Sequence, residues 1–424
     1  MAAFAGTQPS DFFPALKEWT EDFDTINQFL FEDNPTMGLL PQKTVYEGKY
    51  VTVPFMIAAN AAQGANFNTM YNNQTSGQYR EFQIPLSKYY GFGCVDGLTA
   101  ELSRTNKGAF EQAFKSELEA CMIQYADNVS SLGIWGLGSG VRGTFTGNTG
   151  ITTGVITLTY ATDAIKFNLG MALQCFNAGT PIAAPGYVVA VNYSGGTITV
   201  STSQFGAPAN PVGWNASATL SLAVIGDYNN LMLGIPAWIV GALPGQVRPG
   251  PTATSAQNTL FGVDRSVNPD WMAGVYLSLT NYSMKEAMIQ ALMQAKRIGG
   301  GKPDIIVCND ISHAELSKEL EGQRQYIDLE GPTGFTYKAM TVMGSKGPVG
   351  IVPDRYCPSA TMFGLELDTL KLCSAGPLGR PLTYDDGISW FRSTDQDAYQ
   401  LRYGGYPALY VNKPGRNFCA NLAV

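Results

Sequence analysis

The chain has 424 residues, of which 45% are hydrophobic and only 14% are charged, and its net charge is −7. Charged residues usually make up about a quarter of a soluble protein, so we expect other protein to cover much of this surface, unless the chain is a large monomer with a neutral surface rich in Ser, Thr and Asn. The acidic balance argues against a tight, sequence-reading nucleic-acid binder, which would usually be basic, but it is compatible with a container that holds DNA loosely.

The sequence also argues against membrane-bound and disulfide-rich classes. No run reaches the ~20 apolar residues of a membrane helix. The amino terminus lacks the basic region and apolar run of a signal peptide, so we expect cytoplasmic synthesis and no membrane. The seven cysteines are scattered, never in a C-x-x-C spacing, and mostly lie in apolar runs. We therefore expect reduced core residues.

The first two expected elements are an arm and a hairpin. In residues 1–42, prolines interrupt an aromatic-rich segment, which predicts an arm of two short amphipathic helices held only by contact with something else. Two strand-like runs follow, Lys43–Ala59 and Tyr79–Val95, and the second alternates apolar and polar residues. The stretch between them is rich in turn-forming Gly, Asn, Gln and Ser. Together the two runs predict a long hairpin with a wide polar tip.

The hairpin carries the main functional expectation. An isolated two-stranded hairpin is barely stable in water, so it has to lie on another part of the protein or on a neighbouring copy. The candidate contact residues to another subunit are those of the tip: Gln63, Gly64, Asn66, Phe67, Asn68, Tyr71, Asn72 and Asn73.

The clearest helix is expected from Asn106 to about Ser131. Thr105 or Asn106 can cap its start and Gly133 can end it. Its apolar positions recur every three or four residues and form one stripe: Phe110, Phe114, Leu118, Cys121, Tyr125 and Val129.

A β-rich stretch and an α/β unit follow. Short β-runs separated by Gly, Asn and Pro predict an inserted β-domain from about 143 to 226, with a hairpin turning at Ser194–Gly196. After a Pro- and Gly-rich loop, a capping box at Ser283 opens a helix whose stripe runs from Met288 to Ala295. A buried strand comes next, and a second capping box at Ser312 begins another helix.

The carboxyl-terminal third is expected to be strands. Four runs between residues 338 and 374 are apolar enough for strands. The segment 397–412 predicts two antiparallel strands with Gly404 and Gly405 at their bend. We infer that this last sheet packs against the long helix through its tyrosines.

Residues for catalysis are scarce. The chain has one histidine, and His313 beside Ser312 is expected to belong to a helix cap rather than to a Ser-His-Asp site. The glycines at 136–140 and 299–301 resemble nucleotide loops but lack the required context. The pairs Asp385/Asp386 and Asp395/Asp397 are expected to be turn residues. The sequence thus predicts no catalytic, metal or cofactor-binding residue, and no enzyme.

The order of these parts resembles the tailed-phage major capsid proteins, whose fold is named after phage Hong Kong ninety-seven. The closing segments, such as DQDAYQLRYGGYPALYVNKPGRNFCANL, are similar to those of many such subunits. The resemblance implies an α+β fold in six parts, which are listed in chain order: an N-terminal arm (1–42), an E-loop hairpin (43–98), the spine helix of a peripheral domain (99–142), the inserted β-domain (143–226), an α/β axial domain (227–375) and returning peripheral strands (376–424).

The resemblance also implies a function. Copies of the chain would form hexamers and pentamers of an icosahedral shell around packaged double-stranded DNA, contacted non-specifically, and each hairpin would lie across a neighbour. A portal protein and a separate scaffolding protein are the expected partners, while a cement or decoration protein is left open. The expected location is the virion capsid, assembled in the host cytoplasm. Three rivals remain: an encapsulin-like compartment, a hydrolase that uses an Asp pair, and a β-rich phage tail or adhesion protein.

Overall fold

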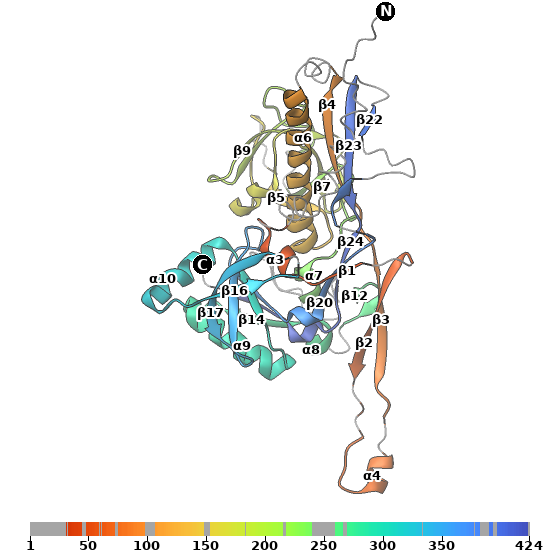
Figure 1. Ribbon diagram of the computed structural model, residues 1–424, viewed down its shortest axis with the longest axis vertical. Helices are drawn as coiled ribbons and strands as arrows, with labels where there is room; N and C mark the ends of the chain where they lie inside the picture. Colours follow the sequence, from red (N-terminus) through yellow and green to blue (C-terminus); the bar gives the residue numbers. More distant parts are fainter. Residues whose placement is uncertain are drawn as a thin grey trace, which may run out of the picture. The chain divides into compact units, whose positions relative to one another are not determined.

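The computed structural model describes residues 31, 33–44, 48–58, 60, 62–72, 75–97, 107–147, 153–182, 184–214, 218–239, 259–265, 269–332, 334–376, 378–381, 390–392 and 397–422. The chain divides into two compact units (Figure 1). The first unit combines Met1–Ser130 with Pro236–Val424, and the second unit is Ser131–Ile235. The chain contains helices as well as strands, and the strands form several separate sheets, which confirms the predicted α+β class.

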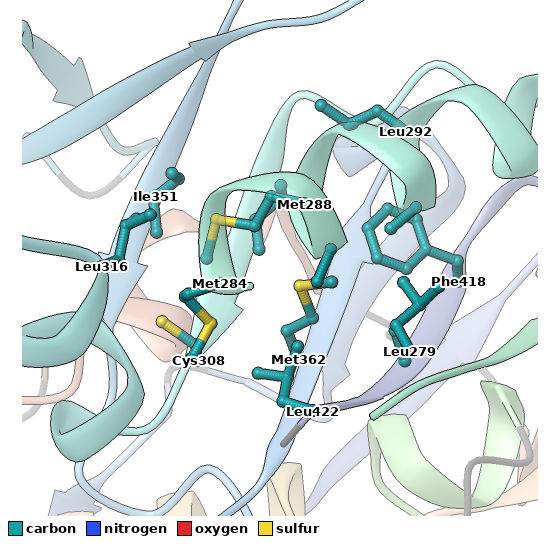
Figure 2. Packing of buried hydrophobic residues seen from close by; sticks show 14 of the residues in the cluster. Leu279, Met284, Met288, Leu292, Cys308, Leu316, Ile351, Met362, Phe418 and Leu422 are labelled. Carbon is teal, nitrogen blue, oxygen red and sulfur yellow. The ribbon is translucent and has the colours of Figure 1, made fainter. Parts of the chain in front are cut away.

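The largest sheet of the first unit is mixed, and seven described strands form it in the order β14-β25-β19-β15-β18-β17-β16. Helices α9 (Met284–Gly299) and α10 (Asp310–Leu320) share one apolar core with it. In Figure 2, Met284, Met288 and Leu292 of α9 lie over side chains of the strands. The strands, in chain order, are β14 (Val275–Leu279), β15 (Ile305–Cys308), β16 (Tyr326–Glu330), β17 (Thr336–Met343), β18 (Pro348–Pro353), β19 (Thr361–Leu365) and β25 (Phe418–Leu422).

The two helix starts in this unit had different outcomes. Ser283 caps α9 as predicted, because its side chain accepts a hydrogen bond from the Glu286 amide, and Gly300, in a left-handed conformation, caps the carboxyl end of α9. The predicted start of the second helix was wrong by three residues. Asn309 caps α10 and its Oδ1 accepts from the Ile311 amide at 3.1 Å, while Ser312 is buried in the first turn. Strand β15 ends at Cys308, so Asn309 follows it directly and caps the helix three residues earlier than the sequence predicted.

The long helix α6 spans Lys107–Asn128 and continues as a π-helical turn, Val129–Ile134. The prediction that Gly133 ends the helix was therefore wrong, because the helical turn runs through this glycine. Cys121, Tyr125 and Val129 of the predicted stripe are buried. The side chains of Phe110, Phe114 and Leu118, and the capping candidates Thr105 and Asn106, lie outside the described set.

A second sheet packs on α6. It joins β4 (Tyr89–Asp96), β21 (Arg380–Pro381), β22 (Trp390–Arg392) and β23 (Ala398–Gly405). The rings of Tyr125 and Tyr403 meet edge to face at 5.4 Å, which confirms the inferred contact between the carboxyl-terminal strands and the helix. The predicted pairing within 397–412 was wrong. β23 pairs with β4, whereas β24 (Pro407–Val411) pairs with β20 (Leu370–Ser374), so the strands part at Tyr406 into different sheets.

The second unit is a β-structure whose main path runs β5-β11-β7-β9-β10-β6. Strands β9 and β10 pair antiparallel across the turn at 193–196, as predicted. The predicted insertion of 143–226 lies within this unit, while β5 and β7 had no clear sequence signal. Its buried core includes Phe145, Phe167 and Trp214. Its strands are β5 (Val141–Thr146), β6 (Val155–Thr157), β7 (Ala172–Asn177), β8 (Thr180–Pro181), β9 (Gly186–Asn192), β10 (Thr197–Ser201) and β11 (Thr219–Val224).

The predicted arm is partly core. Residues 1–30 lie outside the described set, but Phe31 is buried and its carbonyl accepts a hydrogen bond from the Tyr337 hydroxyl at 2.6 Å. Helix α3 (Pro35–Leu39) follows, and the Thr36 hydroxyl donates to the buried Asp354 carboxylate. The chain is therefore tied to the large sheet from residue 31 onward, and only the preceding segment remains a candidate arm.

Candidate inter-subunit surface

The hairpin is shorter than the sequence predicted. Strand β2 (Tyr50–Ala58) pairs antiparallel with β3 (Gln78–Pro85). The flanking segments belong elsewhere, because β1 (Gln42–Thr44) pairs with β20 and β4 pairs with β23. The length of the hairpin is limited because its flanking strands pair with partners more than 300 residues away in the sequence. The local alternation of apolar and polar residues does not reveal such partners.

The base of the hairpin is anchored in its own subunit. Phe82 is fully buried, and its ring meets Phe55 at 5.8 Å and Trp238 at 5.3 Å. The Trp238 indole N–H donates to the Leu409 carbonyl at 3.1 Å. The base thus follows the first of the two expected alternatives, contact with another part of the protein, because alternation places one apolar face of the hairpin against the core.

A buried arginine supports this anchor. The Arg265 guanidinium donates to the carbonyls of Ala237 and Trp238 at 3.2 and 3.0 Å, and its side chain has no exposed surface. Burial lowers the pKa of Arg265 to about 10. The carbonyl partners satisfy a cation that would otherwise be costly to bury, so the position of the Trp238 ring is fixed by hydrogen bonds as well as packing.

The tip of the hairpin is exposed. It holds a short helix, α4 (Phe67–Asn72) (Figure 1), and no residue of this helix is buried. Phe67 is 70% and Tyr71 58% exposed, and their rings stack at 6.3 Å. The sequence predicted a polar turn, and the signal that it missed is the four-residue spacing of the two aromatics, which places them on one helix face.

The polar tip residues support the helix or face solvent. The Asn66 carboxamide accepts from the Asn68 amide at 3.0 Å, an arrangement typical of a cap. Asn73 lies outside the described residues. The other predicted polar contact residues of the tip are exposed: Gln63, Gly64, Asn66, Asn68 and Asn72.

A second exposed aromatic surface lies on the sheet that packs on α6. Gly91 and Gly93 of β4 face α6, where a side chain at Gly91 would meet Cys121. The alternate residues Tyr90 and Phe92 point the other way and are 53% and 55% exposed. Tyr90 meets Tyr406 edge to face at 6.4 Å. We call Tyr90, Phe92 and Tyr406 the sheet face.

The described residues considered for catalysis lie on a helix or in a surface ion pair. His313 is half-buried in α10, and burial lowers its pKa against the opposing effect of Asp310. Asp397 is 77% exposed and lies 3.5 Å from Arg392, while Asp385, Asp386 and Asp395 lie outside the described set. The glycines at 299–301 end α9, as expected.

Metal-binding clusters and membrane-spanning helices are likewise absent from the described residues. That part of the chain contains no group of His, Cys, Asp and Glu that could hold a metal ion. In the same residues, no helix has the length and apolarity to cross a membrane. All seven cysteines are free, as predicted.

Comparison with known proteins gives one family match. Residues 223–387 match the family described as SU10 major capsid protein. This segment contains the α9–β15–α10 unit and every strand of the large sheet except β25. A search of curated proteins finds no significant match.

Three solved structures are similar to this chain at low sequence identity. The capsid of cyanophage A-1(L) is 13% identical, with a TM-score of 0.49 over 92% of this chain and 93% of that one. The capsid of Myoviridae phage XM1 is 10% identical, with a TM-score of 0.40 over 91% and 90%. The SrpI encapsulin from Synechococcus elongatus PCC 7942 is 9% identical, with a TM-score of 0.41 over 92% and 88%.

Proposed function

We propose that the chain is a major capsid protein of the tailed-phage type and a component of the virion shell, because residues 223–387 match a family of such proteins. Copies of the chain form hexamers and pentamers that close into an icosahedral shell around packaged double-stranded DNA. Each copy is synthesised in the host cytoplasm and lays its hairpin, the E-loop of the shell, across a neighbour.

The uncovered hairpin tip carries this proposal. Its base is fixed by Phe82 and Trp238, whereas Phe67 and Tyr71 present a stacked aromatic pair to solvent. Aromatic residues dominate the buried centres of protein interfaces, and an anchored base holds the pair in place before contact. A neighbouring subunit is therefore the partner that we assign to the tip.

The sheet face is the surface that we assign to the neighbour's tip. Tyr90 and Phe92 are more than half exposed and are held on a sheet braced by α6. A tip on one surface and its acceptor on another make a heterologous contact, which generates rings when the rotation closes. Hexamers and pentamers are such rings.

The remaining partners follow from the same role. A net charge of −7 suits a container that encloses DNA without trapping it. We propose a portal protein at one vertex and a separate scaffolding protein during assembly, and a decoration protein remains an option for the outer surface. The family match is to a capsid protein, which favours a virion shell over an encapsulin-like compartment.

Deletion of the tip tests the proposal. Removing residues 63–77 and joining the strands by a two-residue turn should leave a folded subunit, because the base contacts of Phe82 are kept. Negative-stain microscopy should then show few closed shells. Shells formed in normal yield and with normal stability would refute the role of the tip, and a stable monomer from the unmodified chain would refute shell formation itself.

A further inference from the structure

A groove in the first unit combines cations with exposed aromatic rings. Its volume is about 650 Å³, within the range of roughly 300–1,000 Å³ typical of small-molecule sites. Tyr79 lines it from the hairpin and is 68% exposed. Trp271 lines it from α8 (Pro269–Met272) and is 39% exposed. The described part of the subunit therefore leaves two aromatic rings open to a ligand in this groove.

The charge of the groove has one sign. Among the described residues that line it, four are cations and none is an acid: Lys296, Arg297, Lys413 and Arg416. Cations in the last turn of a helix compensate its dipole, which accounts for the two on α9 but not for the two that follow β24. Arg416 already pairs with Glu366 at 2.8 Å, so the other three cations supply the charge open to a ligand. A chain with a net charge of −7 thus gathers positive charge in one groove, which favours an anionic ligand.

A shielded acceptor indicates that the ligand also carries a hydrogen-bond donor. The side-chain oxygen Oδ1 of Asn412, which lines the groove, is shielded from solvent and receives no hydrogen bond from the described residues. Buried polar atoms are usually paired. A fully ionised phosphate offers only acceptors, whereas the amino groups of nucleic-acid bases are donors.

Cations, open aromatic rings and an acceptor without a donor together match a nucleoside phosphate. Proteins that bind single-stranded nucleic acid combine cations along the backbone with aromatic side chains on which the bases stack. A partner rich in carboxylates would satisfy the cations alone, and it would leave the exposure of Trp271 and Tyr79 without a reason.

We propose that this groove binds a nucleoside phosphate, with the phosphate on Lys296, Arg297 and Lys413 and the base on Trp271 or Tyr79. The source is a free nucleotide or an unpaired strand of nucleic acid, because both present a phosphate beside an unstacked base. Duplex DNA keeps its bases stacked inside the helix and offers the groove only phosphate. The site therefore differs from the non-specific contact with packaged duplex proposed above, and it does not depend on shell formation.

Equilibrium dialysis of the full-length chain at about 50 mM salt tests the class of ligand. Deoxyadenosine monophosphate and a mixed-sequence single strand of about 20 nucleotides should both bind. The single strand should bind at least about 10-fold more tightly than a duplex of the same length, or than polyglutamate of the same charge, because only its bases can stack. Equal binding of the duplex or of polyglutamate would overturn the assignment, as would no binding at all.

The same assay distinguishes the two sources. A strand that binds much more tightly than the mononucleotide identifies nucleic acid as the source, because contacts beyond one nucleotide then contribute. Equal affinities identify the free nucleotide. Inorganic phosphate should displace either ligand at least about 10-fold less well than the mononucleotide, since it provides no base to stack, and equal displacement would show an anion site only and overturn the proposal.

Charge reversal tests the phosphate contacts. Lys296→Glu with Arg297→Glu should weaken binding of the single strand by about 10- to 100-fold at low salt, and the slope of log affinity against log salt should change from about −2 to about −0.7. Lys318→Glu with Arg324→Glu makes the same charge change at exposed sites outside the groove and should leave both quantities nearly unchanged. An unchanged slope in the groove variant would overturn the phosphate assignment.

Removal of the rings tests the base contact. Trp271→Ala with Tyr79→Ala should weaken binding of the single strand by about 5- to 100-fold, while the displacement by inorganic phosphate should stay the same. Trp271→Phe with Tyr79→Phe keeps two stacking rings and should retain most of the affinity. Equal losses in the two variants would overturn the stacking assignment, and the phenylalanine pair keeps this test valid if the alanine pair folds poorly.

The outcomes separate this inference from the proposed function. Shells seen by microscopy from a chain that binds no nucleotide would refute the groove site and leave the shell proposal intact. Nucleotide binding by a chain that stays a stable monomer would support the groove site and refute the shell. Deletion of residues 63–77 tests the hairpin tip and not the groove, since none of the described lining residues lies in that range.

Discussion

Replacing the two tip aromatics by alanine should separate assembly from folding. Fully enclosed Phe and Tyr side chains bury about 150–250 Å² each. With 70% of Phe67 and 58% of Tyr71 exposed in the subunit, a neighbour can cover roughly 190–320 Å² on the two rings. At ~25 cal/mol per Å² this is about 5–8 kcal/mol, an upper bound because binding also costs ordering and desolvation.

The expected loss in contact free energy is therefore about 2–4 kcal/mol for Phe67→Ala with Tyr71→Ala, which corresponds to about 30- to 1,000-fold in subunit affinity. The critical concentration for assembly, measured by light scattering and microscopy, should rise accordingly. The free energy of unfolding should change by less than ~0.5 kcal/mol, because both residues are on the surface.

The matched control is Tyr326→Ala on β16, which is 58% exposed like Tyr71 but lies away from the tip. It should assemble with nearly normal affinity. An unchanged critical concentration in the tip variant would refute the reasoning, as would a loss of folding that accounts for the loss of shells.

Four further predictions concern stability and the accessibility of the cysteines. Phe82→Ala should lower the free energy of unfolding in urea by about 3–5 kcal/mol, because it empties a fully buried site, whereas Tyr79→Ala should be nearly neutral; equal effects would contradict the anchored base. Asn309→Ala should cost about 1–3 kcal/mol in the same assay, since it leaves the Ile311 amide and the Cys357 carbonyl unpaired, while Ser312→Ala should cost little; the reverse order would restore the earlier capping assignment. At pH 8 a thiol reagent should label at most the half-buried Cys94 in the folded chain and all seven cysteines after unfolding. Burial raises the pKa of three thiols from 9.0 to about 12, so the folded chain keeps protons that the unfolded chain loses, and stability should fall as pH rises from about 9 to about 12; a flat profile would contradict these shifts. The three thiols are Cys121, Cys175 and Cys308.

Local periodicity was sufficient to predict an element and its buried residues wherever one apolar face of that element packs against one core. The stripe of Met288, Ala291, Leu292 and Ala295 is buried on α9 as predicted, and the four apolar residues from Ile305 to Cys308 form a fully buried strand. These patterns depend only on which side of an element faces away from water, and that information is contained in consecutive residues.

Strand partners and the exact start of a helix could not be predicted from local periodicity. The run Tyr79–Val95 looked like one strand, but its halves pair with different partners, β2 and β23. Ser312 was predicted to cap the second helix, but β15 ends at Cys308 and the next residue, Asn309, is the cap. In each case the deciding contact comes from another segment, and its free energy does not depend on local propensity.

The sequence by itself determined the α+β class, the reduced cysteines and the order of hairpin, helix and α/β unit that indicated a shell protein. Tertiary structure decided which part of the hairpin is free to meet a neighbour. Phe82 at its base and Phe67 at its tip are the same residue type in the sequence, yet one is fully buried and the other 70% exposed. The difference arises because Trp238, more than 150 residues away, covers the first ring, and such long-range burial is decided only when the chain has folded.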